Sequence, residues 1–513
     1  MPAARLLENS ATLMIVSVLT IMLFAAGNLP WQLEDYDQAK QAFTSWQIVT
    51  APHLLYQQTP SGKVATKPPL VAWISAFLYR VTRSWEIAWR APSFAAALAL
   101  GTLLWRRAAV IAGAAGGLIA LAAFSLNLLT PRLATLVRTD MPLALVTFLI
   151  ALLFFDKIRR AQRWQARDRA LLFLLLSAGM LIKGPIVYAF VLPAMVLFAW
   201  RYRGTAQAQS IATGWWPWII SLALFLAWAV AGIETVPGFY DEVVVREFAG
   251  RFGETLHRPQ PLYFYLPHLL QKWAPWSLLL IGLLVADFRA ARLPPETPAA
   301  TTGTAVAKTA FGETAAERKK RWFSQLTPEI FWLLASGVGG LIVMSCIPSK
   351  RVDRIFPVVP PLCLAAGVMS GLAVANSDRL ARWFAITLAG AVVLSSSYTV
   401  ARIVSGYRCD RGALVKCARD LQTRARQNGR RFALLRDDNE ALVVYLQLPG
   451  FLRQGEAVEA WNSGKLEALI GSEERMRALL PQLAQNGELR HEPLCPNAPR
   501  DEHYLVISRA APP

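Results

Sequence analysis

Residues 11–27, ATLMIVSVLTIMLFAAG, contain no charged side chain and approach the length at which a helix crosses a lipid bilayer. Similar apolar runs recur along the chain as far as residues 383–400, WFAITLAGAVVLSSSYTV. Of the 513 residues, 54% are hydrophobic and only 17% are charged, which is typical of a membrane protein rather than a soluble enzyme. The sequence therefore predicts a polytopic, all-helical membrane domain.

The basic residues indicate which side of the membrane each loop occupies. The net charge is +19, and much of it lies in short stretches between the apolar runs. These stretches contain Lys157, Arg159, Arg160, Arg163, Arg167 and Arg169; Arg201 and Arg203; and Arg318, Lys319, Lys320 and Arg321. Lys and Arg in short loops mark the cytoplasmic side of a membrane protein. Because no nucleic-acid recognition motif accompanies the charge, we interpret it as topology and expect no nucleic-acid partner.

Threading the chain by this rule predicts about eleven membrane spans, within a range of eleven to thirteen. They fall at about 11–29, 86–105, 109–127, 141–156, 169–182, 185–200, 213–232, 265–286, 329–346, 354–375 and 382–403. The apolar segment 68–82 is interpreted as interfacial or re-entrant, because a further crossing there would invert the later topology. The loops at about 30–68 and 233–264 are then expected on the periplasmic side.

The C-terminal part of the chain differs from the rest in composition. Residues 412–429 have helical periodicity and end at Asn428-Gly429, and the stretches RRFALLR and HYLVISR have the pattern of strands. We therefore predict a transmembrane domain over residues 1–403 and a small periplasmic α/β domain over residues 404–513. Residues 292–317, rich in Pro, Thr, Ala and Gly, are predicted to form a flexible cytoplasmic linker.

Three of the five cysteines, Cys409, Cys417 and Cys495, fall in this predicted outer domain, where oxidation is permitted. One pair of them would form a disulfide and leave one thiol free. Sequence spacing does not choose the pair.

Charged residues expected at the outer face are candidates for function, because ionisable groups near a membrane are costly to place. They are Glu34, Asp35 and Asp37 after the first span; Lys67; Asp140 at the start of a span; and Lys350, Arg351 and Arg354 between two spans. Basic groups facing carboxylates suit an anionic, lipid-borne substrate: the cations hold a phosphate and a carboxylate accepts a proton from the acceptor.

Several of these residues also have a structural interpretation. Asp37 is most simply a solvated residue at a helix start. Lys67 is also explained by a long side chain that extends to the interface. Asp140 is in place to cap a helix beginning at Met141-Pro142.

Six stretches in one order resemble the ArnT branch of the lipid-linked-sugar glycosyltransferases, which have the GT-C fold and are related to protein O-mannosyltransferases. The stretches are the acidic pair after the first span, KPP, RTDMPLAL, LIKGP, HRPQPLYFYLPHLLQKWAPWSLLL and SKRVDRIFPVVPPL. The resemblance covers most of residues 10–400 and, more loosely, the C-terminal domain. It implies a GT-C fold and transfer of a sugar, with inversion, from a polyprenyl-phosphate carrier to an acceptor at the periplasmic face.

The same resemblance implies roles for particular residues. Glu34 and Asp35 match the family's Asp-Glu pair in swapped order, so the general base is one of the two. Lys67 matches a lysine that contacts the carrier phosphate, and Lys350, Arg351 and Arg354 match a phosphate-binding loop. Arg354 stands where the family usually has tyrosine. His257 matches a family position, and we group it with Tyr263 as a supporting candidate.

The resemblance does not extend to a metal site. Thr66 replaces the glutamate that precedes the family's lysine and is associated with a structural metal, so that metal is not carried over. We expect no required cofactor; a divalent metal is compatible with the reaction, but nothing in the sequence supports one.

The leading hypothesis is a glycosyltransferase of the bacterial inner membrane, embedded in the lipid bilayer. Its donor would be an undecaprenyl-phosphate sugar and its acceptor lipid A or a related envelope glycolipid. One alternative is a protein O-glycosyltransferase with the same donor class. A transporter is the other, although transporters place ionisable residues at mid-membrane and show inverted repeats.

Overall fold

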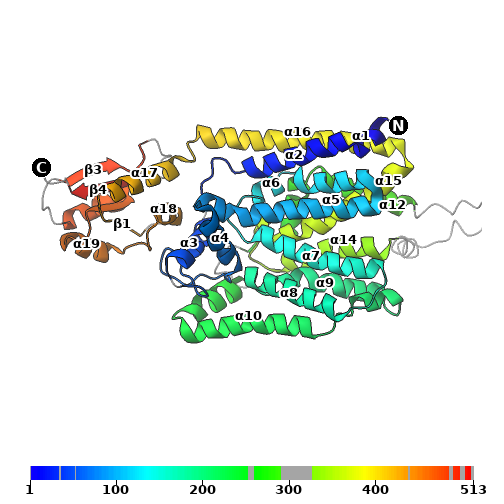
Figure 1. The fold of residues 1–513 in the computed structure, drawn as a ribbon, viewed down its shortest axis with the longest axis horizontal. Helices are drawn as coiled ribbons and strands as arrows, with labels where there is room; N and C mark the ends of the chain where they lie inside the picture. Colours follow the sequence, from blue (N-terminus) through cyan, green and yellow to red (C-terminus); the bar gives the residue numbers. More distant parts are fainter. Residues whose placement is uncertain are drawn as a thin grey trace, which may run out of the picture.

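The protein consists of a long helical bundle with a small sheet-containing domain at one end (Figure 1). The computed structural model describes residues 2–33, 36–51, 53–251, 259–290, 326–436, 439–483, 489–496 and 503–509. The predicted linker at 292–317 lies outside these ranges. In Figure 1 the helix α16 runs the length of the bundle and leads into the C-terminal domain.

The bundle contains every segment for which the sequence predicted a span. Its α-helices are α1 (Pro2–Glu8), α2 (Ser10–Ala26), α3 (Tyr36–Thr50), α4 (Leu70–Thr82), α5 (Trp85–Ser125), α6 (Thr130–Leu133), α7 (Asp140–Arg159), α8 (Ala166–Lys183), α9 (Ile186–Arg201), α10 (Trp216–Thr235), α11 (Tyr265–Lys272), α12 (Trp276–Ala290), α14 (Pro328–Cys346), α15 (Val359–Asn376) and α16 (Asp378–Arg408). Short irregular helices are η1 (Ala206–Ile211), η2 (Tyr240–Phe248), η3 (Ala249–Arg251), η4 (Leu262–Phe264) and η5 (Val352–Val358).

Within the described ranges, six helices are long and apolar enough to cross a membrane, or seven if the bent pair of η4–α11 and α12 counts as one span. The chain is thus a multi-pass membrane protein. The eleven predicted spans all fall on helical segments, but α2 and α9 are shorter than this criterion requires and α8 opens with three charged residues. The number of crossings therefore remains a prediction.

Helix α5 is a hairpin of two antiparallel legs rather than one rod. The backbone leaves the helical region at Ala112 and Gly113, and Gly113 has φ 75°. A Cβ atom on Gly117 would lie 2.9 Å from the carbonyl oxygen of Trp105. Twelve residues of straight helix would separate those positions by about 18 Å, so the chain must reverse between them. Two separate helical legs are thus present where spans were predicted at 86–105 and 109–127, but the turn falls at Ala112-Gly113 rather than at Arg106-Arg107.

Helix α4 is the segment predicted to be interfacial or re-entrant. It has 13 residues, which gives a length of about 20 Å, short of the roughly 30 Å hydrocarbon core. It packs against α3 and α5. This helix follows Pro68 and Pro69 directly, so its start fixes the direction of the chain after Lys67.

The C-terminal domain is built on a four-stranded mixed sheet, which confirms the predicted α/β class. Its strands are β1 (Phe432–Leu434), β2 (Ala468–Ser472), β3 (Leu489–Pro493) and β4 (Tyr504–Arg509), in the order β1-β2-β4-β3. Strand β1 is parallel to β2, and β4 is antiparallel to both β2 and β3. Its helices are α17 (Ala413–Gln427), α18 (Glu440–Tyr445), α19 (Gln454–Asn462), α20 (Glu473–Leu479) and η6 (Leu480–Gln482). The predicted helix within 412–429 and the two predicted strands are all present.

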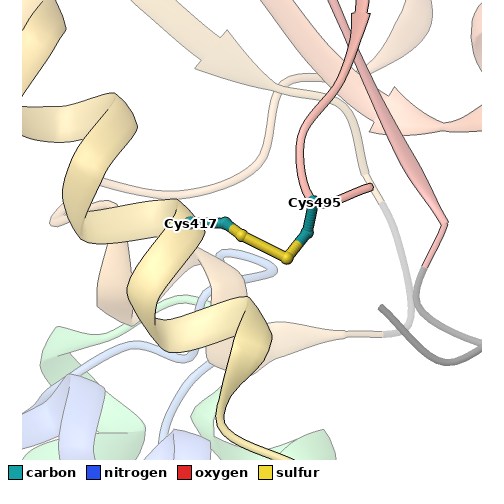
Figure 2. The surroundings of a disulfide bond; sticks show 2 residues. All are labelled: Cys417 and Cys495. Atoms are coloured by element: carbon teal, nitrogen blue, oxygen red, sulfur yellow. A yellow bond between two sulfur atoms is a disulfide. The ribbon is translucent and has the colours of Figure 1, made fainter. Parts of the chain in front are cut away.

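A disulfide between Cys417 and Cys495 ties α17 to the segment that follows β3 (Figure 2). Cys409 remains a free, exposed thiol. The structure thus selects one of the pairings that the sequence left open. Because the bridge closes a loop over 78 positions, it restricts the unfolded domain strongly.

The C-terminal domain is docked on the end of the bundle through an apolar cluster and several polar contacts. Phe43 of α3 and Trp89 of α5 share a buried cluster with residues of α18. The backbone N–H of Leu33 donates to the Tyr445 hydroxyl, and Arg419 forms an ion pair of 2.8 Å with Glu86. Helix α3 is therefore held between the bundle and this domain.

Candidate functional site

A polar cleft of about 360 Å³ opens where the bundle meets the C-terminal domain. Its lining comes from α3, the segment before α4, the start of α7, the end of α8, η2, η3 and the segment before α15. It includes eight basic side chains, Lys40, Lys67, Arg138, Lys183, Arg246, Arg251, Arg351 and Arg354, and four acidic ones, Asp37, Asp140, Glu247 and Asp353. The excess of cations suits an anionic ligand.

Helix α3 presents one face to the cleft. Asp37, Lys40, Gln41 and Thr44 are spaced by three or four residues, so they lie on the same side of the helix. The Asp37 carboxylate forms an ion pair with Arg351. Lys67, and then Arg351, hold the pKa of Asp37 well below its usual range despite its burial. Asp37 is therefore ionised and part of the site, not merely a solvated helix start.

Lys67 reaches the cleft from the end of a tight β-hairpin. Gln58 pairs with Val64 in an antiparallel bridge, and the Thr59 N–H donates to the Lys63 carbonyl at 2.7 Å. Gly62 supplies the left-handed backbone, φ 77°, that this turn requires. Within the described part of the chain, the Lys67 ammonium has no carboxylate at ion-pair distance. Its charge is thus available to a ligand.

Asp140 and Lys183 form an ion pair at the cleft wall. Asp140 is the first residue of α7 and only 5% exposed, and Lys183 is the last residue of α8. The alternative that Asp140 caps α7 is wrong: Thr139 occupies the N-cap, and the Asp140 carboxylate turns to Lys183 instead. This ion pair brings together the stretches RTDMPLAL and LIKGP, although its two residues are 43 positions apart in the sequence.

The loop before α15 divides its basic residues between different tasks. Arg351 contacts Asp353 at 3.5 Å as well as Asp37. Arg354 donates to the carbonyl and hydroxyl of Ser349, at 2.8 and 3.2 Å, and has no carboxylate at ion-pair distance among the described residues. Lys350 does not line the cleft, since its ammonium donates to the Gln260 carbonyl at 2.8 Å.

The remaining predicted site residues are not brought to the cleft by the described structure. Tyr263 is 70% exposed and does not contribute to the lining. Glu34, Asp35 and His257 lie outside the described residues. Tyr36, the first described residue after the acidic pair, lines the cleft.

Five basic cleft residues were missed by the sequence interpretation: Lys40, Arg138, Lys183, Arg246 and Arg251. Arg138 binds Asp353 and stands two positions before Asp140, so the charge of that stretch was a usable signal. Lys183 lies within LIKGP, one of the six stretches that resemble the family, but no role was assigned to this residue. Arg246 and Arg251 fall in the predicted outer loop and are paired with Glu242 and Glu247, and no spacing distinguished them.

Metal binding receives no support from the described residues. They contain no group of three His, Cys, Asp or Glu side chains arranged to hold a metal ion. The four carboxylates of the cleft lining are each engaged by a basic side chain.

Comparisons with known proteins point to one group of enzymes. Residues 66–231 match the family described as dolichyl-phosphate-mannose-protein mannosyltransferase. An undecaprenyl phosphate-alpha-4-amino-4-deoxy-L-arabinose arabinosyl transferase of Sodalis glossinidius is 30% identical over 27% of this chain and 25% of its own length. The corresponding transferase of Yersinia pestis is 24% identical over 52% of this chain and 41% of its own. The matches thus span well under two thirds of these curated relatives.

The fold match is more extensive than the sequence match. The crystal structure of ArnT from Cupriavidus metallidurans bound to undecaprenyl phosphate superimposes with a TM-score of 0.68 over 98% of both chains, at 15% identity. The chain therefore has the GT-C fold of ArnT and is ArnT-like in sequence, as the six stretches predicted.

Proposed function

We propose that this chain is an inner-membrane glycosyltransferase that moves a sugar from undecaprenyl phosphate to lipid A or a related envelope glycolipid. The observation that carries the proposal is the set of three cleft cations without a carboxylate partner among the described residues, Lys40, Lys67 and Arg354. The family and fold comparisons supply the class of donor, because the relatives are named for transfer from undecaprenyl phosphate.

Two of these cations, Lys67 and Arg354, account for binding of the donor phosphate. Arg138 and Arg351 are engaged by Asp37 and Asp353, so they organise the cleft. Lys67 and Arg354 keep their charge for a ligand, and charge-assisted contacts to phosphate are among the strongest polar contacts. We therefore assign the donor phosphate to these two residues, in preference to Lys350 and Arg351.

The same two cations would assist the chemical step. In the proposed transfer, the bond from the anomeric carbon to the phosphate oxygen breaks and a bond to the acceptor oxygen forms on the opposite face. Undecaprenyl phosphate leaves with the bonding electrons, and the acceptor proton passes to a carboxylate. Fixed positive charge beside the departing phosphate stabilises the charge that develops there.

The general base in this proposal is Glu34 or Asp35. Asp37 is a poor candidate, because its depressed pKa and its ion pair with Arg351 make it a weak proton acceptor. Asp140 is committed to Lys183. The acidic pair lies between Leu33, held by Tyr445, and the cleft residue Tyr36.

The proposed orientation places the cleft and residues 404–513 on the periplasmic side and the basic loop at 157–169 in the cytoplasm. The Lys/Arg distribution supports it. An alkaline phosphatase fusion at the C-terminus should be active and one near Arg163 inactive. The reverse pattern would contradict the orientation.

The acceptor is tested by comparing cells with and without the gene. Mass spectrometry of lipid A should show a sugar-sized mass that disappears when the gene is deleted. A protein O-glycosyltransferase is the second candidate, favoured by the match of residues 66–231 to protein mannosyltransferases. If the protein is such an enzyme, deleting the gene should instead remove a glycan from envelope proteins and leave lipid A unchanged.

A further inference from the structure

Glu440 is a buried carboxylate at the contact between the C-terminal domain and the cleft. It is the first residue of α18, which packs against α3, and it is 5% exposed. One of its oxygens accepts a hydrogen bond from the Ser61 hydroxyl at 3.3 Å. The other, Oε2, is buried without a hydrogen-bond partner. A buried acceptor left in this state is costly and calls for an explanation.

Lys40 is the neighbouring cation on the cleft side. It projects from α3 into the cleft lining, and its ammonium lies 3.6 Å from the centre of the Tyr36 ring. Within the described residues, no carboxylate approaches it to ion-pair distance, although Glu440 is close enough to act on its charge. Lys40 stands on α3, the helix that packs against α18 of the C-terminal domain, while Arg354 is held by Ser349.

We propose that Lys40 binds a phosphate of the acceptor glycolipid and that Glu440 is a positioning residue whose protonation switches this subsite on. The inference rests on the proposed function, since it presumes that Lys67 and Arg354 are occupied by the donor. It adds a second anion subsite, at the part of the cleft lined by α3.

The switch follows from the burial of both groups. Burial raises the pKa of Glu440 to about 7, against the opposing effect of Lys40, and it lowers the pKa of Lys40 to about 8. At pH 6 Glu440 is mainly neutral and Lys40 is charged, so a phosphate meets an uncompensated cation. At pH 7.5 Glu440 is mainly ionised, which neutralises Lys40 and repels the phosphate.

Other charged groups face this pair and modify its titration. Asp37, on α3, raises the pKa of both residues, while Lys67 and Arg246 lower that of Lys40. Glu242 and the Tyr36 hydroxyl complete the surroundings, and Glu242 is paired with Lys63 and Arg246. The lipid phosphate also gains charge between pH 6 and 7.5, because the second pKa of a phosphate monoester is about 6. The role of Glu440 is therefore measured as the difference in pH dependence between the wild-type protein and Glu440→Gln.

The test measures binding of lipid A to the purified full-length protein, with undecaprenyl phosphate at saturation, at pH 6.0 and 7.5. Bisphosphorylated lipid A is compared with enzymatically dephosphorylated lipid A. If only the form with protonated Glu440 is competent, phosphorylated lipid A should bind about fourfold more weakly at pH 7.5, in proportion to that fraction. The dephosphorylated lipid should show no such change.

Variants separate the switch from a structural role. Glu440→Gln should keep the tighter affinity at both pH values, Lys40→Met should bind weakly at both, and Lys40→Arg should retain the pH dependence. Glu459→Gln, an exposed carboxylate on α19 of the same domain, is the matched control. Unchanged affinity for undecaprenyl phosphate shows that each variant is folded.

The outcomes also distinguish this inference from the proposed function. If undecaprenyl phosphate binds but phosphorylated lipid A binds equally at both pH values, or not at all, the subsite is wrong and the donor assignment stands. Retention of the full pH dependence by Glu440→Gln would likewise overturn the role of Glu440. If undecaprenyl phosphate does not bind to the wild-type protein, the proposed function itself fails.

Discussion

Arg351 binds the carboxylate of Asp37 across the cleft, joining the loop before α15 to the first turn of α3. The two residues are 314 positions apart in the sequence. The pair neutralises one cation and one carboxylate, and it leaves Lys67 and Arg354 as cations for a ligand. It also fixes α3 relative to the bundle.

Asp37→Asn should lower the stability of the protein, because it leaves Arg351 without this partner. Both side chains are about one third exposed or less, at 29% and 31%. A hydrogen bond to a charged group contributes about 1.5–3 kcal/mol. Thermal unfolding of Asp37→Asn, Arg351→Met and the double variant would measure the coupling. Additive losses would show that the pair contributes no stability.

Variants of the acidic pair before α3 should separate donor binding from sugar transfer. Glu34→Gln or Asp35→Asn, whichever carries the base, should reduce turnover by roughly 10²–10⁴, as loss of a general base does. Affinity for undecaprenyl phosphate should persist, since neither residue is assigned to the phosphate. Turnover is measured with purified carrier-linked sugar. Near-normal transfer by both variants would exclude the pair as the source of the general base.

Glu440 should make stability depend on pH in a defined direction. Its pKa is raised by burial to about 7 from 4.5, so its contribution is full below about pH 4.5 and is lost as pH rises through 7. Glu440→Gln cannot ionise and escapes this loss. The melting temperature of the wild type, relative to that of Glu440→Gln, should therefore fall between pH 5 and pH 8. Glu459→Gln should show no such trend, and a rise with pH would contradict the assignment.

The sequence predicted the fold better than the site. Runs of apolar residues located the helical segments, and period and turn residues located the strands of the C-terminal domain, because both signals are local. The division of the α5 segment into two parts was also predictable, since Arg106 and Arg107 interrupt the apolar run, although the chain turns at Ala112-Gly113. The disulfide partner of Cys417 was not predictable from the sequence, because pairing depends on a distance between segments that only the folded domain defines.

Within the site, the loop in which a charged residue lies predicted its role less well than the residue with which it pairs. Lys67 and Arg354 were predicted to bind phosphate, and the structure places both in the cleft. Lys350, in the same stretch as Arg354, turns to a backbone carbonyl instead. Asp37 was interpreted most simply as a solvated residue at a helix start, and its partner Arg351 lies on a distant segment. Ion pairing across the fold decides which charges remain free, and a local pattern does not contain that information.

We infer that Lys67 and Arg354 hold the phosphate of a polyprenyl carrier. Binding of undecaprenyl phosphate to the purified protein is the direct measurement of this role. Lys67→Met and Arg354→Met should each weaken binding by about ten- to a hundredfold, the equivalent of about 1.5–3 kcal/mol. Lys416→Met, at an exposed lysine of α17, is the matched control and should bind like the wild type. Wild-type affinity in both cleft variants, with the proteins folded, would contradict the claim.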